Sequence, residues 1–168
     1  MRVFGIVGRS DSGKTQLITR LVRLAITRGL RVSTVKHAHH TLDLDAPGKD
    51  SWLHREAGAH EVLVASAQRW ALLHERRAAP EPPLESLLAR LEPCDLVLVE
   101  GFKQEVQPRL EVYRKACGQQ PLALEDRGLC AVATPDPECF EARPGLQLLP
   151  LDEAAVVLDY ILRTAAQA

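Results

Sequence analysis

The sequence VFGIVGRSDSGKTQLITRLV, residues 3–22, decides the fold. It begins with the apolar run 3–7, which predicts a buried β-strand. Gly8 to Thr15 then match the pattern G-x-x-x-x-G-K-[ST] in full. Apolar residues recur at helical spacing after the motif, which predicts an amphipathic helix that ends before Gly29. A strand, a glycine-rich loop and a helix in this order predict a phosphate-binding loop.

The residues of this motif are the first candidate site. Glycine at both ends permits backbone turns that a Cβ atom would obstruct, so successive N–H groups can surround a phosphate, assisted by the positive end of the helix. We expect Lys14 to reach the β- and γ-phosphates and the Thr15 hydroxyl to ligate Mg²⁺. Asp11 should point to solvent, because its carboxylate would repel phosphate. The predicted nucleotide-binding residues are Gly8, Arg9, Ser10, Asp11, Ser12, Gly13, Lys14 and Thr15.

Strand and helix patterns alternate along the rest of the chain. Predicted strands cover 31–36, 61–66, 68–74, 95–100, 109–114 and 129–133, and predicted helices cover 51–58, 85–91 and 154–162. We expect Asp152 to cap the last helix. A strand–helix–strand unit implies parallel pairing with a right-handed crossover. The prediction is therefore an α/β, P-loop NTPase-type three-layer fold with a mostly parallel central sheet, in a single nucleotide-binding domain over 1–168.

Composition and charge argue against several classes of protein. The chain has 168 residues, of which 46% are hydrophobic and 26% charged, as is typical of a globular protein. Its formal net charge of −1 offers no general attraction, so we expect no nucleic-acid and no membrane partner. We expect no signal peptide, and no apolar run approaches the roughly 20 residues of a membrane span. The four cysteines form no CxxC pair, which favours a cytoplasmic location.

An acid closes the most apolar predicted strand. Glu100 follows LVLV at 96–99, a run that suits a central parallel strand covered on both faces. A P-loop site needs an acid near Mg²⁺, at the carboxyl end of a neighbouring strand. We expect Glu100 to contact the metal, directly or through water. Asp95 begins the same strand, at the opposite edge of the sheet, and is expected to be a turn or cap residue.

Three histidines and three acids lie within the polar segment 37–50, after the second predicted strand. One interpretation is a metal site, because imidazole and carboxylate suit several divalent ions. A second is a set of phosphate and Mg²⁺ contacts, with Asp43 or Asp50 holding a water on the ion. A third is a solvated polar loop. For Asp43 and Asp50 we favour the second interpretation.

Five segments together carry a resemblance to a known family. They are GRSDSGKT (8–15), VKHAHH (35–40), DAPGKDS (45–51), QRWALLHE (68–75) and DLVLVEGFK (95–103). In this order they resemble the molybdopterin-guanine dinucleotide biosynthesis adapter protein B (MobB) family, over about residues 3–114. The phosphate loop alone is unspecific, whereas PGKDS together with VEGFK at this separation is specific.

The resemblance implies a P-loop protein that binds GTP and Mg²⁺, has weak GTPase activity and forms a homodimer. It implies as partner the guanylyltransferase that attaches GMP to molybdopterin, to which the adapter delivers or presents nucleotide. Molybdopterin or molybdenum cofactor is a further ligand to consider. By position, Gly13, Lys14 and Thr15 would bind phosphate and Mg²⁺. Asp50 and Glu100 would serve the metal, and Lys36 and Lys103 would lie near the phosphates.

The sequence departs from the family pattern in three places. Thr41 stands where family members often have an acid, which weakens a metal role for that loop. Gln16 replaces a common second threonine. Pro135 lies in a stretch that often reads Ala-Ser-Asp in the family, and Asp136 beside it is the residue expected to accept from guanine N1 and N2. No NKxD motif is present, so GTP rather than ATP follows from the resemblance alone.

Two other functions are compatible with a P-loop. The histidine segment suggests a metal-insertion GTPase of the nickel type, although the Cys-Pro-His set or N-terminal His tract of such proteins is absent. A small-molecule kinase needs an acceptor pocket, and this short chain has little material for a lid. The resemblance favours the adapter of molybdenum cofactor biosynthesis. We assign no catalytic residue and expect at most a slow GTPase.

Overall fold

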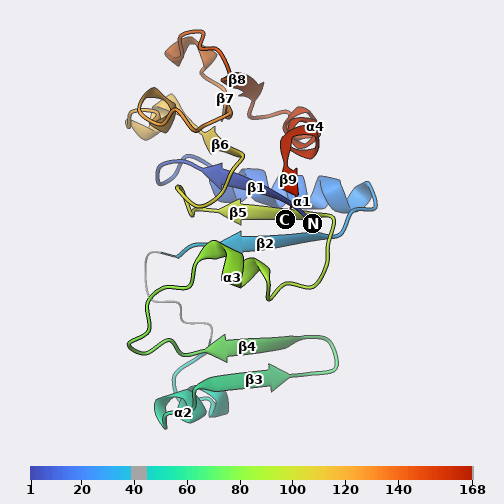
Figure 1. The fold of residues 1–168 in the computed structure, drawn as a ribbon, viewed down its shortest axis with the longest axis vertical. Coiled ribbons are helices and arrows are strands. Elements are labelled where there is room, and N and C mark those ends of the chain that lie inside the picture. The colour runs from blue at the N-terminus through green and yellow to red at the C-terminus, as the bar shows by residue number, and fades with distance from the viewer. Residues whose placement is uncertain (39–44, 168) are drawn as a thin grey trace. The chain divides into compact units, whose positions relative to one another are not determined.

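The computed structural model describes residues 1–38 and 45–167 (Figure 1). The chain forms two compact units, the first made of Met1–His37 with Leu84–Ala168 and the second of Ala38–Pro83. All strands of the larger sheet belong to the first unit. The single domain over 1–168 stays a prediction. Among the helices described, none combines the length and apolar character needed to cross a bilayer.

A seven-stranded sheet forms the centre of the first unit. Its parallel strands lie in the order β2 (Val32–Lys36), β5 (Leu96–Glu100), β1 (Arg2–Val7), β6 (Arg109–Val112), β7 (Ala131–Thr134) and β8 (Gln147–Pro150). The short β9 (Ala166–Gln167) pairs antiparallel with β1. The mostly parallel sheet is confirmed. Since β1 lies between β5 and β6, the carboxyl ends of these three strands meet at one edge.

Helices cover both faces of this sheet, as the alternation of side chains along β5 requires. Leu96 and Leu98 pack into the cluster that holds the apolar residues of α1 (Lys14–Thr27) and α4 (Ala154–Thr164). Val97 and Val99 pack on the other face, with Leu84 of α3 (Leu84–Leu88). These four side chains of β5 are fully buried. The three-layer α/β fold, of the P-loop NTPase type, is confirmed.

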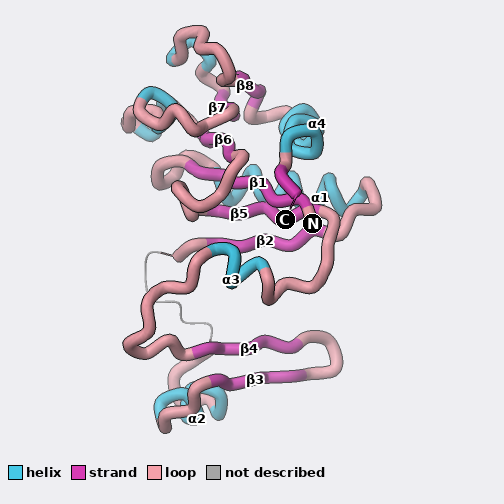
Figure 2. The backbone as a smooth tube through the Cα atoms, viewed as in Figure 1, coloured by secondary structure: helices cyan, strands magenta, loops and turns pink. Residues whose placement is uncertain are grey.

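Short 3-10 helices follow β6 and β7, in segments that Figure 2 shows mostly as loop. They are η1 (Lys115–Cys117), η2 (Leu122–Leu124) and η3 (Pro137–Cys139). A third apolar cluster lies beneath them and includes Val7, Tyr113, Val132 and Phe140. The Tyr113 and Phe140 rings pack edge to face, with centroids 5.2 Å apart.

The described residues of the second unit form one helix and one hairpin. They are α2 (Asp50–Glu56), β3 (Glu61–Ala65) and β4 (Trp70–His74), and the two strands pair antiparallel, which confirms the predicted strand pair. Several large apolar side chains of this unit are exposed: Leu53, Leu63, Val64, Trp70 and Leu72.

The predicted cap of the last helix is wrong. Glu153, not Asp152, is the N-cap residue of α4, and the Glu153 side chain forms no capping hydrogen bond. The Arg20 guanidinium of α1 instead donates to the main-chain carbonyls of Leu151 and Asp152. These hydrogen bonds from α1 hold the turn that precedes α4. The Asp152 carboxylate does not cap the helix.

Replacing Gly5 by alanine tests how closely β1 is packed. A Cβ atom there would lie 2.5 Å from Val106 Cγ1 and 2.8 Å from Arg109 Cβ. We expect Gly5→Ala to lower the free energy of unfolding by about 1–3 kcal/mol, because overpacking forces neighbours to move. Denaturant titration measures it. In the Gly5→Ala/Val106→Ala pair, the combined loss should be smaller than the sum of the single losses; full additivity would contradict the predicted clash.

Candidate functional site

The loop of residues 8–15, called the phosphate loop below, has the backbone that its glycines predict. Gly8, Asp11 and Gly13 have φ angles of 153°, 60° and 96°, values that favour glycine and, less often, aspartate. A Cβ at Gly8 would lie 2.5 Å from the carbonyl oxygen of Val112. Asp11 is exposed, as expected for a carboxylate beside a phosphate site. The turn is tight, and glycine is required at its start.

Ser12 provides a test of whether phosphate fits this loop. It is only 2% exposed, and its Oγ has no hydrogen-bond partner among the described residues. A buried hydroxyl without a partner costs about 1–3 kcal/mol. A phosphate oxygen in the loop would accept from this hydroxyl, so the orphaned Oγ fits an anionic ligand.

Lys14 lies over the loop, and its Nζ donates to the carbonyl oxygen of Arg9 at 2.6 Å. Burial is the main cause that lowers the pKa of the Lys14 ammonium, and the charges of Lys103 and Lys36 lower it further, against the opposing charges of Glu100 and Asp11. Two further lysines therefore act on Lys14. A polyanion would relieve both the repulsion and the loss of hydration.

Glu100 lies at the end of β5, beside the phosphate loop. Its Oε1 accepts from the Thr15 hydroxyl at 3.5 Å and lies 3.6 Å from Lys36 Nζ. In the sheet, Glu100 pairs with Ile6 on one side and Lys36 on the other. The predicted metal residues Thr15 and Glu100 are thus brought together. A hydroxyl and a carboxylate are oxygen ligands of the kind Mg²⁺ prefers.

An open hollow of ≈ 250 Å³ lies at the start of α1. It is lined by Asp11, Gly13, Lys14, Thr15 and Gln16. The hollow, the buried Ser12 hydroxyl and the Lys14 ammonium, together called the cradle below, lie at the carboxyl edge of the sheet, where ligands bind in open α/β folds.

The other predicted site residues lie in different places. Lys103 is exposed in the loop after β5, and Asp50 is the first residue of α2 in the second unit. Asp136 follows β7, and its Oδ2 accepts from the main-chain N–H of Lys115 at 2.8 Å. Asp43 lies outside the described residues. The binding roles of these residues stay predictions.

A metal site was one interpretation of the segment 37–50, and only residues 37, 38 and 45–50 of this segment are described by the structure. Within 1–38 and 45–167, no three His, Cys, Asp or Glu side chains gather in a way that could hold a metal ion. His37 stacks on Phe102, with ring centroids 4.7 Å apart, and its main-chain N–H donates to the Glu100 carbonyl at 2.8 Å. In this structure His37 therefore helps to pack the end of β5.

Two residues near the loop were missed by sequence reasoning. Arg114, just after β6, lies against Gly13, where a Cβ would be 3.3 Å from its Nε. Glu111 pairs with Val7 in the sheet and is fully buried. The only sequence signal was their predicted strand, RLEVYR. Its place next to β1 depends on strand order, which the sequence pattern does not show.

Glu111 fastens the segment beside the loop. Its two carboxylate oxygens accept from the main-chain N–H groups of Leu122 and Ala123 at 2.7 and 2.8 Å. The adjoining Gln120 carbonyl accepts from Arg9 Nε at 3.5 Å. Burial raises the pKa of the Glu111 carboxyl, against the two N–H bonds and the Arg9 charge. Glu111 therefore holds the segment around η2, and Arg9 links that segment to the phosphate loop.

A family model, related sequences and a solved structure all match this chain to the same group of proteins. The family model described as "Molybdopterin guanine dinucleotide synthesis protein B" matches residues 3–135. Proteins named molybdopterin-guanine dinucleotide biosynthesis adapter protein match from Haemophilus influenzae (43% identity over 162 residues, 95% of this chain and 86% of that protein) and Escherichia coli K12 (38% over 156 residues, 91% and 87%). The crystal structure of Bacillus subtilis MobB matches with a TM-score of 0.76 and 27% identity, covering 100% of both chains.

The raised pKa of Glu111 predicts a pH dependence of stability. The folded state holds the Glu111 proton more tightly than the unfolded state, whose pKa is near 4.5. This contribution is therefore complete below pH 4.5 and is lost as pH rises through the folded-state pKa. In urea titrations we expect the free energy of unfolding of the wild type to fall relative to Glu111→Gln over that range. A pH-independent difference between the two proteins would contradict the raised pKa.

Proposed function

Because the chain belongs to the molybdopterin guanine dinucleotide synthesis protein B (MobB) family, we propose that it is a GTP-binding adapter of molybdenum cofactor biosynthesis. The observation that supports nucleotide binding most is the cradle itself. It combines the buried Ser12 hydroxyl, which has no hydrogen-bond partner among the described residues, with the Lys14 ammonium, whose pKa is lowered mainly by burial and further by the charges of Lys103 and Lys36. Such a site is suited to the triphosphate of a nucleotide.

The proposed ligand carries Mg²⁺. Thr15 and Glu100 would hold the ion, since their oxygens lie 3.5 Å apart beside the loop. Asp50 and Asp43 remain the further candidates from the sequence. Bound there, the ion would supply positive charge to the β- and γ-phosphate oxygens. This chain's own contribution is to bind and orient the phosphates, and we assign it at most slow GTP hydrolysis.

The proposed partner is the guanylyltransferase that attaches GMP to molybdopterin. The relatives' name, adapter protein, supports a role in that reaction. In this role the chain would present or deliver the nucleotide to the partner. The preference for GTP over ATP belongs to the same proposal, as does a cytoplasmic location, which the four cysteines without CxxC spacing favour.

We also propose that the chain acts as a homodimer. The hairpin β3–β4 supports this, because a two-stranded sheet is marginally stable by itself. Its Leu63 and Trp70 are 62% and 64% exposed. A second copy that covered such residues would remove apolar surface from water, as in the isologous interfaces of two-fold dimers.

Replacing Lys14 by alanine tests the cradle. We expect Mg²⁺–GTP to bind about 10- to 100-fold more weakly, because a charge-assisted hydrogen bond to phosphate is lost, while the melting temperature stays unchanged. Isothermal titration calorimetry measures the affinity. Arg127→Ala is the control, because it removes one exposed positive charge from the segment that precedes β7, at the opposite edge of the sheet. Equal affinity in Lys14→Ala and wild type would refute the phosphate role.

A binding experiment tests the partner. Immobilised chain, with and without Mg²⁺–GTP, is presented with purified molybdopterin guanylyltransferase and, as a control, with an unrelated nucleotidyltransferase. We expect selective retention of the guanylyltransferase, and expect Lys14→Ala to abolish any dependence on GTP. Failure of the guanylyltransferase to bind in every nucleotide state would remove the adapter proposal while leaving nucleotide binding intact.

A further inference from the structure

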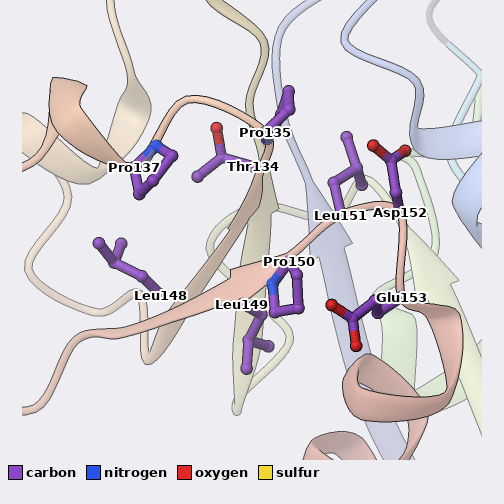
Figure 3. Close-up of a pocket in the computed structure, with 9 residues that line it drawn as sticks. All are labelled: Thr134, Pro135, Pro137, Leu148, Leu149, Pro150, Leu151, Asp152 and Glu153. Carbon is purple, nitrogen blue, oxygen red and sulfur yellow. The ribbon is translucent and has the colours of Figure 1, made fainter.

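A second, larger cavity of ≈ 470 Å³ lies in the first unit, at the carboxyl ends of β7 and β8. Figure 3 shows its lining: Thr134, Pro135 and Pro137 come from the end of β7 and the segment after it, and Leu151, Asp152 and Glu153 from the segment after β8. This β7–β8 cavity is on the same edge of the parallel sheet as the phosphate loop. None of the residues that line it belongs to the phosphate cradle.

Two arginines connect the β7–β8 cavity to the phosphate loop. Arg114 lies against Gly13, and its Nη2 is 3.9 Å from Asp152 Oδ1. Arg20, on the helix that begins at Lys14, donates to the carbonyls of Leu151 and Asp152. The Arg114 side chain therefore contacts both the phosphate loop and the rim of the cavity. This shared contact of Arg114 with Gly13 and Asp152 is the basis for asking whether one ligand occupies both the loop and the cavity.

The lining of the cavity suits a purine. Proline and leucine side chains offer apolar surfaces for the faces of a flat ring, and carboxylates stand at the rim. A carboxylate only accepts hydrogen bonds and can accept two side by side. Guanine presents two adjacent donors, N1–H and the N2 amino group, whereas adenine has an acceptor at N1 and no amino group at C2. A rim carboxylate therefore selects guanine.

Asp152 is the carboxylate best placed for this contact. It does not cap α4, its side chain is 75% exposed, and it is the rim acid beside Arg114. In Figure 3 its carboxylate lies beside the Leu151 side chain, whereas that of Glu153 points toward Pro150. Asp136 is already bonded to the Lys115 N–H and is not among the lining residues.

We propose that the β7–β8 cavity receives the base of a guanine nucleotide and that the Asp152 carboxylate accepts from its N1–H and N2 amino group. The proposal rests on the proposed function, because the phosphates must occupy the loop. It adds the residue that distinguishes GTP from ATP, and it assigns that role to Asp152 in place of Asp136.

Exchange of the acid for its amide tests the proposal. Xanthine has a C2 carbonyl where guanine has the amino group, so an asparagine can donate to that carbonyl while accepting from N1–H. For full-length Asp152→Asn we expect GTP affinity to fall about 10- to 100-fold and XTP affinity to rise, as measured by calorimetry with Mg²⁺. Glu153→Gln and Asp136→Asn are matched controls, and both should keep the wild-type preference for GTP over XTP.

Tripolyphosphate separates the base from the phosphates. It should bind wild type and Asp152→Asn equally, because it has no base. If it binds while GTP is no tighter than ATP, or if Asp136→Asn rather than Asp152→Asn switches the preference to XTP, the base proposal is overturned and the phosphate cradle stands. If neither tripolyphosphate nor GTP binds wild type, both are overturned. Unchanged melting temperatures would show that Asp152→Asn folds normally.

Discussion

The close packing of the phosphate loop against the end of β6 is the constraint on which the rest of the site depends. A Cβ at Gly8 would meet the Val112 carbonyl at 2.5 Å, and a Cβ at Gly13 would lie 3.3 Å from Arg114 Nε. Since β1 lies between β5 and β6, each neighbour brings one charged residue to the loop: Glu100 from β5, and Arg114 from just beyond β6. Strand order thus assembles a site from segments distant in sequence.

The electrostatics of the cradle favour the binding of an anion. Burial of the Lys14 ammonium, with the charges of Lys103 and Lys36 nearby, lowers its pKa, and the opposing charges of Glu100 and Asp11 offset only part of this effect. The Ser12 hydroxyl, for which the described part of the chain offers no hydrogen-bond partner, adds a second unmet demand. Both demands are met by the same ligand, an anion with several oxygens. The buried Glu111 carboxylate accepts from two main-chain N–H groups that lie outside the phosphate loop, and so it stabilises the neighbouring segment.

Sequence patterns predicted the parts whose signals are local. The apolar runs of β1 and β5, the glycine and lysine spacing of the loop, and the acid that ends β5 all appear where expected. The missed strands β8 and β9 are only four and two residues long, and β8 ends in a proline, so they lack a clear period.

Tertiary contacts account for the rest of what the sequence could not show. Asp152 resembles a helix cap, but the hydrogen bonds from Arg20 to the turn are long-range, and α4 begins after Glu153 instead. Likewise, the RLEVYR segment contains no sign that Glu111 is buried or that Arg114 lies on Gly13. Both facts follow from the pairing of β6 with β1, and pairing partners are not encoded in any local pattern.

The most direct test of the central claim is a crystal structure of the chain with Mg²⁺ and a non-hydrolysable GTP analogue. The account predicts phosphate oxygens within the loop, in hydrogen-bond contact with the Ser12 hydroxyl and the Lys14 ammonium, and with Thr15 and Glu100 beside the metal ion. A structure in which the nucleotide binds elsewhere, while the Ser12 hydroxyl keeps no partner and Lys14 stays on the Arg9 carbonyl, would contradict it.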